Sequence, residues 1–95
     1  MNDIPTLKRA IAAMHGCDCS HVETSKVHEM MDGATVWRGE VETFSLSGHP
    51  KAVVAYAWTY MDDSNEKQHV AILKLPPVVG PREAVQVTIA SRLLK

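Results

Sequence analysis

The chain lacks the features that mark three classes of protein. None of its apolar runs approaches the roughly 18 residues that a membrane-spanning helix needs. It has only two cysteines, Cys17 and Cys19, and a bond between them would close a very small loop and stabilise little. Ten Lys and Arg residues stand against 11 Asp and Glu residues, which leaves a net charge of -1 and no excess of cations for phosphates. We therefore expect neither a membrane protein, a disulfide scaffold nor a dedicated nucleic-acid binder.

The size and composition of the chain are those of one packed unit. It has 95 residues, of which 45% are hydrophobic, and we expect a single α+β domain over residues 1–95. The segment Met1–Thr6 has no basic region followed by an apolar stretch, so it does not fit a secretory signal. These features predict a cytoplasmic protein with no membrane segment.

A helix is expected near the N-terminus. Four apolar residues recur at helical spacing and form one stripe: Ile4, Leu7, Ile11 and Met14. Pro5 suits the first turn of a helix, where its missing N–H is not needed, and Gly16 suits a left-handed stop. Together these features predict a helix over 4–15.

The C-terminal segment has two competing patterns. Val85 and Ile89 lie four residues apart, which favours a helix, and Gly80-Pro81 is typical of a helix start. Apolar residues also alternate along this segment, which suits a strand. Because a length of about 14 residues favours a helix, we predict a helix over 81–94.

The middle of the chain is typical of an antiparallel sheet. Segments rich in β-branched and aromatic residues predict strands over 22–31, 35–46, 51–61 and 67–75, the first of them weakly patterned. Asp32-Gly33 is a strong signal for a tight turn. The order of elements predicts an α+β fold, an antiparallel meander of three to four strands with an N-terminal and a C-terminal helix packed on one face.

A predicted register assigns each side chain to one face of this sheet. Pairing Leu46 with Ala52 across the turn at Gly48 gives two different faces. One face carries alanines among larger apolar groups: Trp37, Val41, Ala55, Ala57, Ala71, Leu73 and Leu75. Helices approach a sheet closely over small side chains, so we expect both helices on this face. The other face is then open and carries the candidate site: Arg38, Glu40, Tyr56, Trp58, Tyr60, Val70 and Ile72.

Several interpretations of this aromatic face remain open. A register slip of one residue would exchange the faces and make Tyr56, Trp58 and Tyr60 a core stripe. If the face is open, its aromatic residues suit a partly wet contact, because Tyr and Trp combine an apolar body with a polar tip. This interpretation predicts a homodimer. A small-ligand site is a third interpretation, and single-stranded nucleic acid is disfavoured because Glu40 beside the aromatics would repel phosphates.

One cluster of soft metal ligands precedes the sheet: His15, Cys17, Cys19 and His21. Four such ligands would fill a zinc or copper shell. In an extended segment, however, alternate residues lie about 6–7 Å apart in a row and cannot surround one ion. A soft-metal protein that binds zinc or copper through this segment is therefore the alternative hypothesis, and the main interpretation has no cofactor.

No catalytic residue stands out. Cys17 follows the end of the predicted helix, and the negative end of the helix dipole disfavours a reactive thiolate there. The sequence therefore predicts a non-enzymatic interaction or assembly module that self-associates through its open sheet face.

Overall fold

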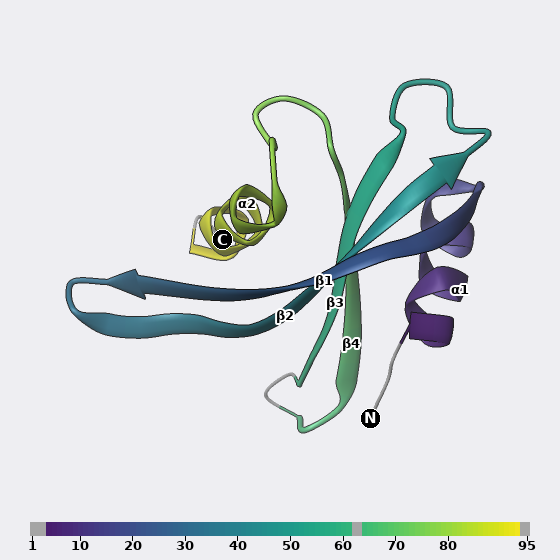
Figure 1. The fold of residues 1–95 in the computed structure, drawn as a ribbon. Coiled ribbons are helices and arrows are strands. Elements are labelled where there is room, and N and C mark those ends of the chain that lie inside the picture. The colour runs from purple at the N-terminus through teal and green to yellow at the C-terminus, as the bar shows by residue number, and fades with distance from the viewer. Residues whose placement is uncertain (1–3, 62–63, 94–95) are drawn as a thin grey trace.

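The computed structural model describes residues 4–61 and 64–93 of the chain. Within them lie two helices and four strands: α1 (Ile4–His15), β1 (Asp18–Met31), β2 (Ala34–Ser47), β3 (Val54–Met61), β4 (Lys67–Leu73) and α2 (Pro81–Leu93). The strands form one antiparallel sheet in the order β1-β2-β3-β4 (Figure 1). The predicted α+β fold, a meander with a helix at each end of the chain, is confirmed.

Both helices form where the local sequence predicts them. At the end of α1, Gly16 takes a φ of 67° and its N–H donates to the Ala12 carbonyl at 2.9 Å, the left-handed stop that glycine permits. The C-terminal segment is helical from Pro81, so the alternative strand is excluded over the described residues. Position 94, the last of the predicted helix, lies outside them.

β1 and β2 form a long hairpin that projects from the rest of the sheet. Its turn is Asp32-Gly33, with φ values of 52° and 80°, which gives the twist that antiparallel strands favour. β1 begins at Asp18, four residues before the predicted start at 22. Because β2 pairs with β3 only over Glu42–Ser45, the outer half of the hairpin has no third strand beside it (Figure 1).

The two helices cover opposite faces of the sheet, so the expectation that they share one face is wrong. α1 packs on the alanine face, and the buried residues of that cluster are Leu7, Ile11, Cys17, Cys19, Phe44, Ala55, Ala57 and Ala71. α2 packs on the other face, and the buried residues there are Val27, Val41, Tyr56, Trp58, Val78, Ala84 and Val85. Figure 1 shows the sheet between the two helices.

The register between β2 and β3 explains this difference. Thr43, not Glu42, lies opposite Tyr56, so the predicted pairing was wrong by one residue. The register between β3 and β4, with Met61 opposite Lys67, is as predicted. A shift of one residue turns every side chain of a strand to the other face. Trp37 and Val41 therefore join the aromatic side chains beneath α2.

A histidine side chain shapes the turn that sets this register. Nδ1 of His49 accepts hydrogen bonds from the backbone N–H groups of Lys51 and Ala52, at 3.1 and 3.0 Å. The turn closes with a hydrogen bond from the Leu46 N–H to the Val53 carbonyl at 2.8 Å. Leu46 is thus bonded to Val53 rather than to the predicted partner Ala52, and the whole β2–β3 ladder moves by one residue.

One buried carboxylate joins α2 to the hairpin. Glu29 of β1 is 6% exposed, and its Oε1 accepts a hydrogen bond from Nε of Arg82 at 2.7 Å. The side-chain amide of Gln86 donates to the same oxygen at 3.3 Å. Because a buried carboxylate without partners is costly, these contacts hold α2 over the projecting strands.

We expect Trp58→Ala to lower the free energy of unfolding by about 3–5 kcal/mol, because the indole is 2% exposed and its loss leaves a cavity beneath α2. Val53→Ala is the control, since Val53 is 74% exposed and should change stability by less than about 0.5 kcal/mol. Urea unfolding followed by circular dichroism measures both. Equal stability of the two variants would contradict the buried position of Trp58.

We expect Glu29→Ala to lower the free energy of unfolding by about 1.5–3 kcal/mol, the range for hydrogen bonds to a charged group. Glu23→Ala is the matched control, because Glu23 lies on the same strand and is exposed. Thermal unfolding of the two variants compares them. If both melt at the same temperature, the contacts of Glu29 with α2 do not stabilise the fold.

Candidate functional site

The aromatic part of the predicted site lies in the core. Tyr56 and Trp58 are 4% and 2% exposed, and Tyr60, Val70 and Ile72 are half-buried against the same cluster. The rings of Trp37 and Trp58 meet edge to face, with centroids 5.7 Å apart. The expectation of an open aromatic face is therefore wrong, because α2 covers it.

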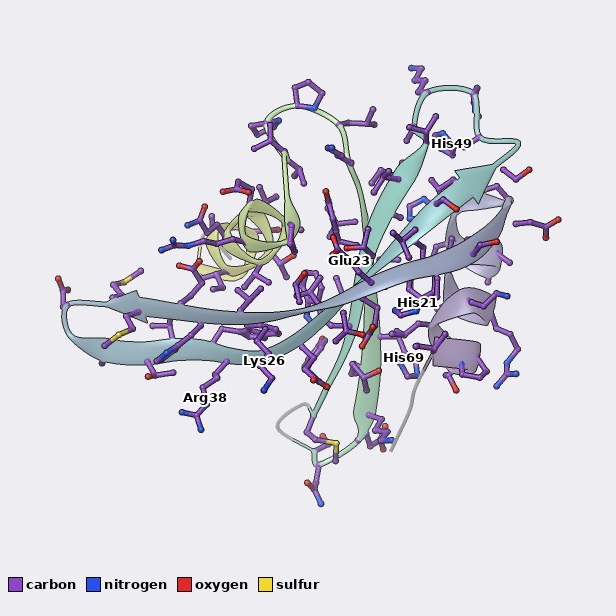
Figure 2. The ribbon with its side chains drawn as sticks, viewed as in Figure 1. His21, Glu23, Lys26, Arg38, His49 and His69 are labelled. Atoms are coloured by element: carbon purple, nitrogen blue, oxygen red, sulfur yellow. The ribbon has the colours of Figure 1, made fainter. Side chains whose placement is uncertain are left out.

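The charged part of the predicted site lies on the opposite face and is exposed. Arg38 and Glu40 point away from α2, as do three residues of β1. Together they form what we call the polar hairpin face: Thr24, Lys26, His28, Arg38 and Glu40. Figure 2 shows Lys26 and Arg38 on the side of the hairpin away from α2.

Cross-strand pairing sets the arrangement of this face. Lys26 lies opposite Glu40, and His28 lies opposite Arg38 one step nearer the tip. One cross-strand pair of the face therefore consists of an ammonium and a carboxylate group, and the next consists of an imidazole and a guanidinium group. At the inner end, Thr24 lies opposite Glu42, so charge of both signs is spread along the ribbon.

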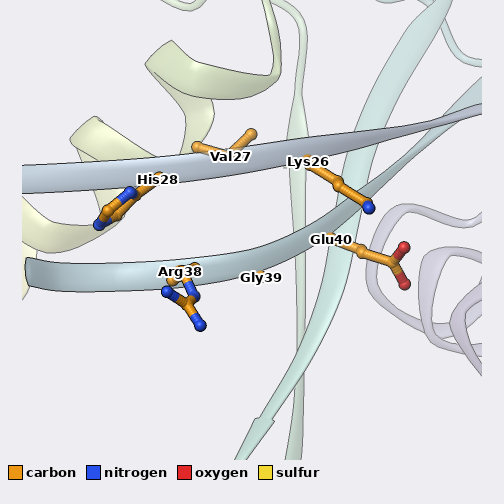
Figure 3. Close-up of a pocket in the computed structure, with 6 residues that line it drawn as sticks. All are labelled: Lys26, Val27, His28, Arg38, Gly39 and Glu40. Atoms are coloured by element: carbon orange, nitrogen blue, oxygen red, sulfur yellow. The ribbon is translucent and has the colours of Figure 1, made fainter.

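A shallow hollow of about 340 Å³ lies among these residues. Its lining consists of Lys26, Val27, His28, Arg38, Gly39 and Glu40. Figure 3 shows the four longer polar side chains on one side of the ribbon and Val27 on the other. On the α2 side, the Trp37 ring covers Gly39 so closely that an added Cβ would lie 3.1 Å from its Cη2. Gly39 thus lets the ribbon lie directly on the core.

Within residues 4–61 and 64–93, the charged side chains of this face, those of Lys26, Arg38 and Glu40, take part in no ion pair. In the outer half of the face, a hydrogen bond joins His28 to Thr35, with Nε2 and Oγ1 2.7 Å apart. Solvent-exposed charges of this kind cost little when alone and remain available to a partner.

A small network borders the polar hairpin face at its inner end. Oε1 of Glu42 accepts a hydrogen bond from Nε2 of His21 at 2.7 Å and another from the Thr24 hydroxyl. Both contacts use one carboxylate oxygen, and the hydroxyl proton goes to the carboxylate rather than to the imidazole. An activated nucleophile needs its hydroxyl bonded to the base, so the network orders side chains and does not form a catalytic triad.

The candidate metal ligands are not brought together. Nε2 of His15 donates to the Ala71 carbonyl at 3.2 Å, whereas His21 binds Glu42 on the sheet. Cys17 and Cys19 are buried and free, and both belong to the core beneath α1. No group of three or more His, Cys, Asp or Glu side chains in the described part of the chain could hold a metal ion. The described residues therefore form no metal site for the alternative hypothesis of a zinc or copper protein.

The thiol of Cys19 belongs to the core beneath α1. Burial raises the pKa of this thiol, and only the charge of Lys8 opposes the shift. The unfolded chain then releases the thiol proton at a lower pH than the folded chain does. This contribution to stability is complete below about pH 9 and is lost as pH rises through the folded pKa.

Comparisons with protein-family models, with curated proteins and with solved structures found no match for this chain. In the part of the chain that the structure describes, α1 and α2 both fall short of the length and apolar character of a transmembrane helix. The site therefore rests on the geometry of the polar hairpin face alone.

The sequence interpretation included Arg38 and Glu40 but missed Lys26 and His28. The sequence does carry a signal for these two residues. Lys26 and His28 lie two apart on a predicted strand, so they share one face of it. The hairpin turn at Asp32-Gly33 does not by itself give the pairing of Lys26 with Glu40, because a register shift between Glu29 and Met30 moves the β1–β2 ladder by one residue.

We expect both thiols to react slowly with Ellman's reagent in the folded protein at pH 8, at the rate at which the structure opens. In urea, both should react at once. The variants Cys17→Ser and Cys19→Ser assign the rates to single thiols. Immediate reaction of either thiol in the native protein would contradict its burial.

Proposed function

We propose that this protein is a non-enzymatic assembly module that binds a second copy of itself through the polar hairpin face. The association needs no cofactor. Two buried free thiols suit a reducing compartment, and the proposal places the protein in the cytoplasm.

One observation carries the proposal: the β1–β2 hairpin projects from the sheet, and α2 covers only one of its two faces. A two-stranded ribbon is marginally stable in water by itself. In this chain α2 covers one face of the ribbon, through Val27 and Glu29, and leaves the other face exposed along its length. An element that projects from the body and keeps one face free is well placed to meet another molecule.

The charges of the face favour a second copy as the partner. Lys26 and Arg38 are cations, Glu40 is an anion, and none is neutralised within the described residues. A face with both signs can complement itself when two copies meet about a two-fold axis, because a cation of each copy can then meet Glu40 of the other. A polyanion or polycation would meet a like charge on this face.

The association should be weak and dependent on salt. A face two strands wide is small beside the roughly 800 Å² per partner of a standard interface. Exposed ion pairs contribute about 0.2–1 kcal/mol each and are screened by salt. A reversible dimer that forms at high protein concentration fits these values.

We expect sedimentation equilibrium at low ionic strength to show a monomer–dimer equilibrium for the wild type. Arg38→Glu should weaken it, because it replaces one of the two cations of the face by a second anion, and added salt should weaken the wild-type dimer too. Lys51→Glu is the control, since Lys51 is exposed in the turn outside the hairpin and carries the same charge change. A wild type that stays monomeric at millimolar concentration would overturn the proposal.

A further inference from the structure

We infer that the outer half of β2 is a free strand edge that binds an extended segment of a partner protein as a further antiparallel strand. The segment carries a basic, an apolar and an acidic residue in that order. This inference goes beyond the proposed self-association and does not depend on it. It follows from the direction of the backbone groups of β2 and from the side chains beside them.

One hydrogen bond of the turn between β2 and β3 shows which backbone groups of β2 point toward β3. The Leu46 N–H donates to the Val53 carbonyl, so the backbone groups of Leu46 lie on the β3 side of the strand. Backbone groups of alternate residues in an antiparallel strand point to the same side. Glu40 and Arg38 precede Leu46 by an even number of residues, so their backbone groups point to this side too, and those of Gly39 point toward β1.

The backbone groups of Arg38 and Glu40 have no strand beside them on this side. The β2–β3 ladder ends at Glu42 and Ala57, and no other strand within the described residues pairs with β2 there. Beyond that point the hairpin and β3 run in different directions (Figure 1). Arg38 and Glu40 are exposed, so an added strand would form hydrogen bonds with the N–H and the carbonyl of each. An unpaired edge of this kind is a template for another chain.

The charges along the edge select the outer residues of the segment. Arg38 and Glu40 lie on the polar hairpin face, so an acidic residue suits the position opposite Arg38 and a basic residue suits the position opposite Glu40. β1 follows the same rule on the other edge of β2, where Lys26 lies opposite Glu40. Because an antiparallel segment runs against β2, its order is a base, a middle residue and an acid.

The middle residue of the segment lies opposite Gly39, on the face that α2 covers. The Trp37 ring lies over Gly39 and is half-buried in the cluster beneath α2. On the other edge of β2, β1 places Val27 opposite Gly39. A valine in the middle of the segment would remove further apolar surface of Trp37 from water. The β2 edge of a second copy would place only a glycine there, so a separate partner with an apolar residue fits better.

A blocked pentapeptide, Thr-Lys-Val-Glu-Thr, tests the inference in an NMR titration of the isotopically labelled protein. We expect the amide signals of Arg38 and Glu40 to shift at millimolar peptide, because their N–H groups gain carbonyl partners. Those of Gly39 and Val41 should shift less, because their N–H groups point toward β1. Unchanged signals of Arg38 and Glu40 would overturn the inference.

N-methylation of single peptide residues gives a matched pair of probes. In the antiparallel pairing, the N–H groups of the lysine and the glutamate point toward β2, and that of the valine points away. A methyl group on the glutamate nitrogen should therefore weaken binding by at least about tenfold, whereas one on the valine nitrogen should leave it unchanged. Equal affinity of the two methylated peptides would show that no strand pairs with β2, which overturns the inference.

A charge exchange tests the register of the pairing. Arg38→Glu should weaken binding of the first peptide, and Thr-Lys-Val-Lys-Thr should bind this variant as the first peptide binds the wild type. Circular dichroism checks that the exposed substitution leaves the fold unchanged. Equal binding of the reversed peptide, Thr-Glu-Val-Lys-Thr, to the wild type would contradict the antiparallel direction.

Two further outcomes separate this inference from the proposed self-association. Strong protection of the Arg38 and Glu40 N–H groups from hydrogen exchange in the protein alone would show that a second copy already pairs with this edge. That result overturns the separate partner as the occupant. A protein that stays monomeric but binds the peptide would overturn the proposed function and leave this inference standing.

Discussion

The whole arrangement depends on the register between β2 and β3, which a single turn sets. His49 accepts two backbone hydrogen bonds within that turn, and Leu46 then bonds to Val53. Side chains of a strand alternate between faces, so a register error of one residue would move Trp37 out of the core and bring Arg38 into it. Burial of an unpaired guanidinium costs far more than one hydrogen bond is worth, and this difference makes the register specific.

Element types were predictable from the sequence, and the distribution of side chains between faces was only partly so. Helices and strands follow from apolar spacing and from turn residues such as Asp32-Gly33, which act locally. The β3–β4 register was also predicted correctly. The β2–β3 register was not, because it depends on hydrogen bonds to the His49 side chain that no hydrophobic pattern encodes. Of the candidate site residues, Arg38 and Glu40 are accordingly exposed, and Trp58 is buried.

The placement of α2 separates stability from interaction in the hairpin. On one face, Trp37 packs against Trp58, and Glu29 binds Arg82 of the helix. These contacts order a ribbon that two strands alone would hold weakly. The opposite face is then free of any packing requirement, so it can carry charges such as those of Lys26 and Glu40 without loss of stability. The polar face of the hairpin can therefore stay exposed because the packing of α2 on the opposite face stabilises the two strands.

The difference between the covered and the exposed face of the hairpin also limits the kind of contact that the exposed face can make. Because α2 covers one side of the ribbon and the other side is exposed and charged, matching charges would suit a contact there better than apolar surface alone. Glu42 borders the inner end of the face, where His21 and Thr24 hold its carboxylate in place. Prior order of this kind lowers the entropy lost on association. A small charged face can thus support a specific contact although its area is modest, and α1 on the same side of the sheet restricts the directions from which a second copy can approach.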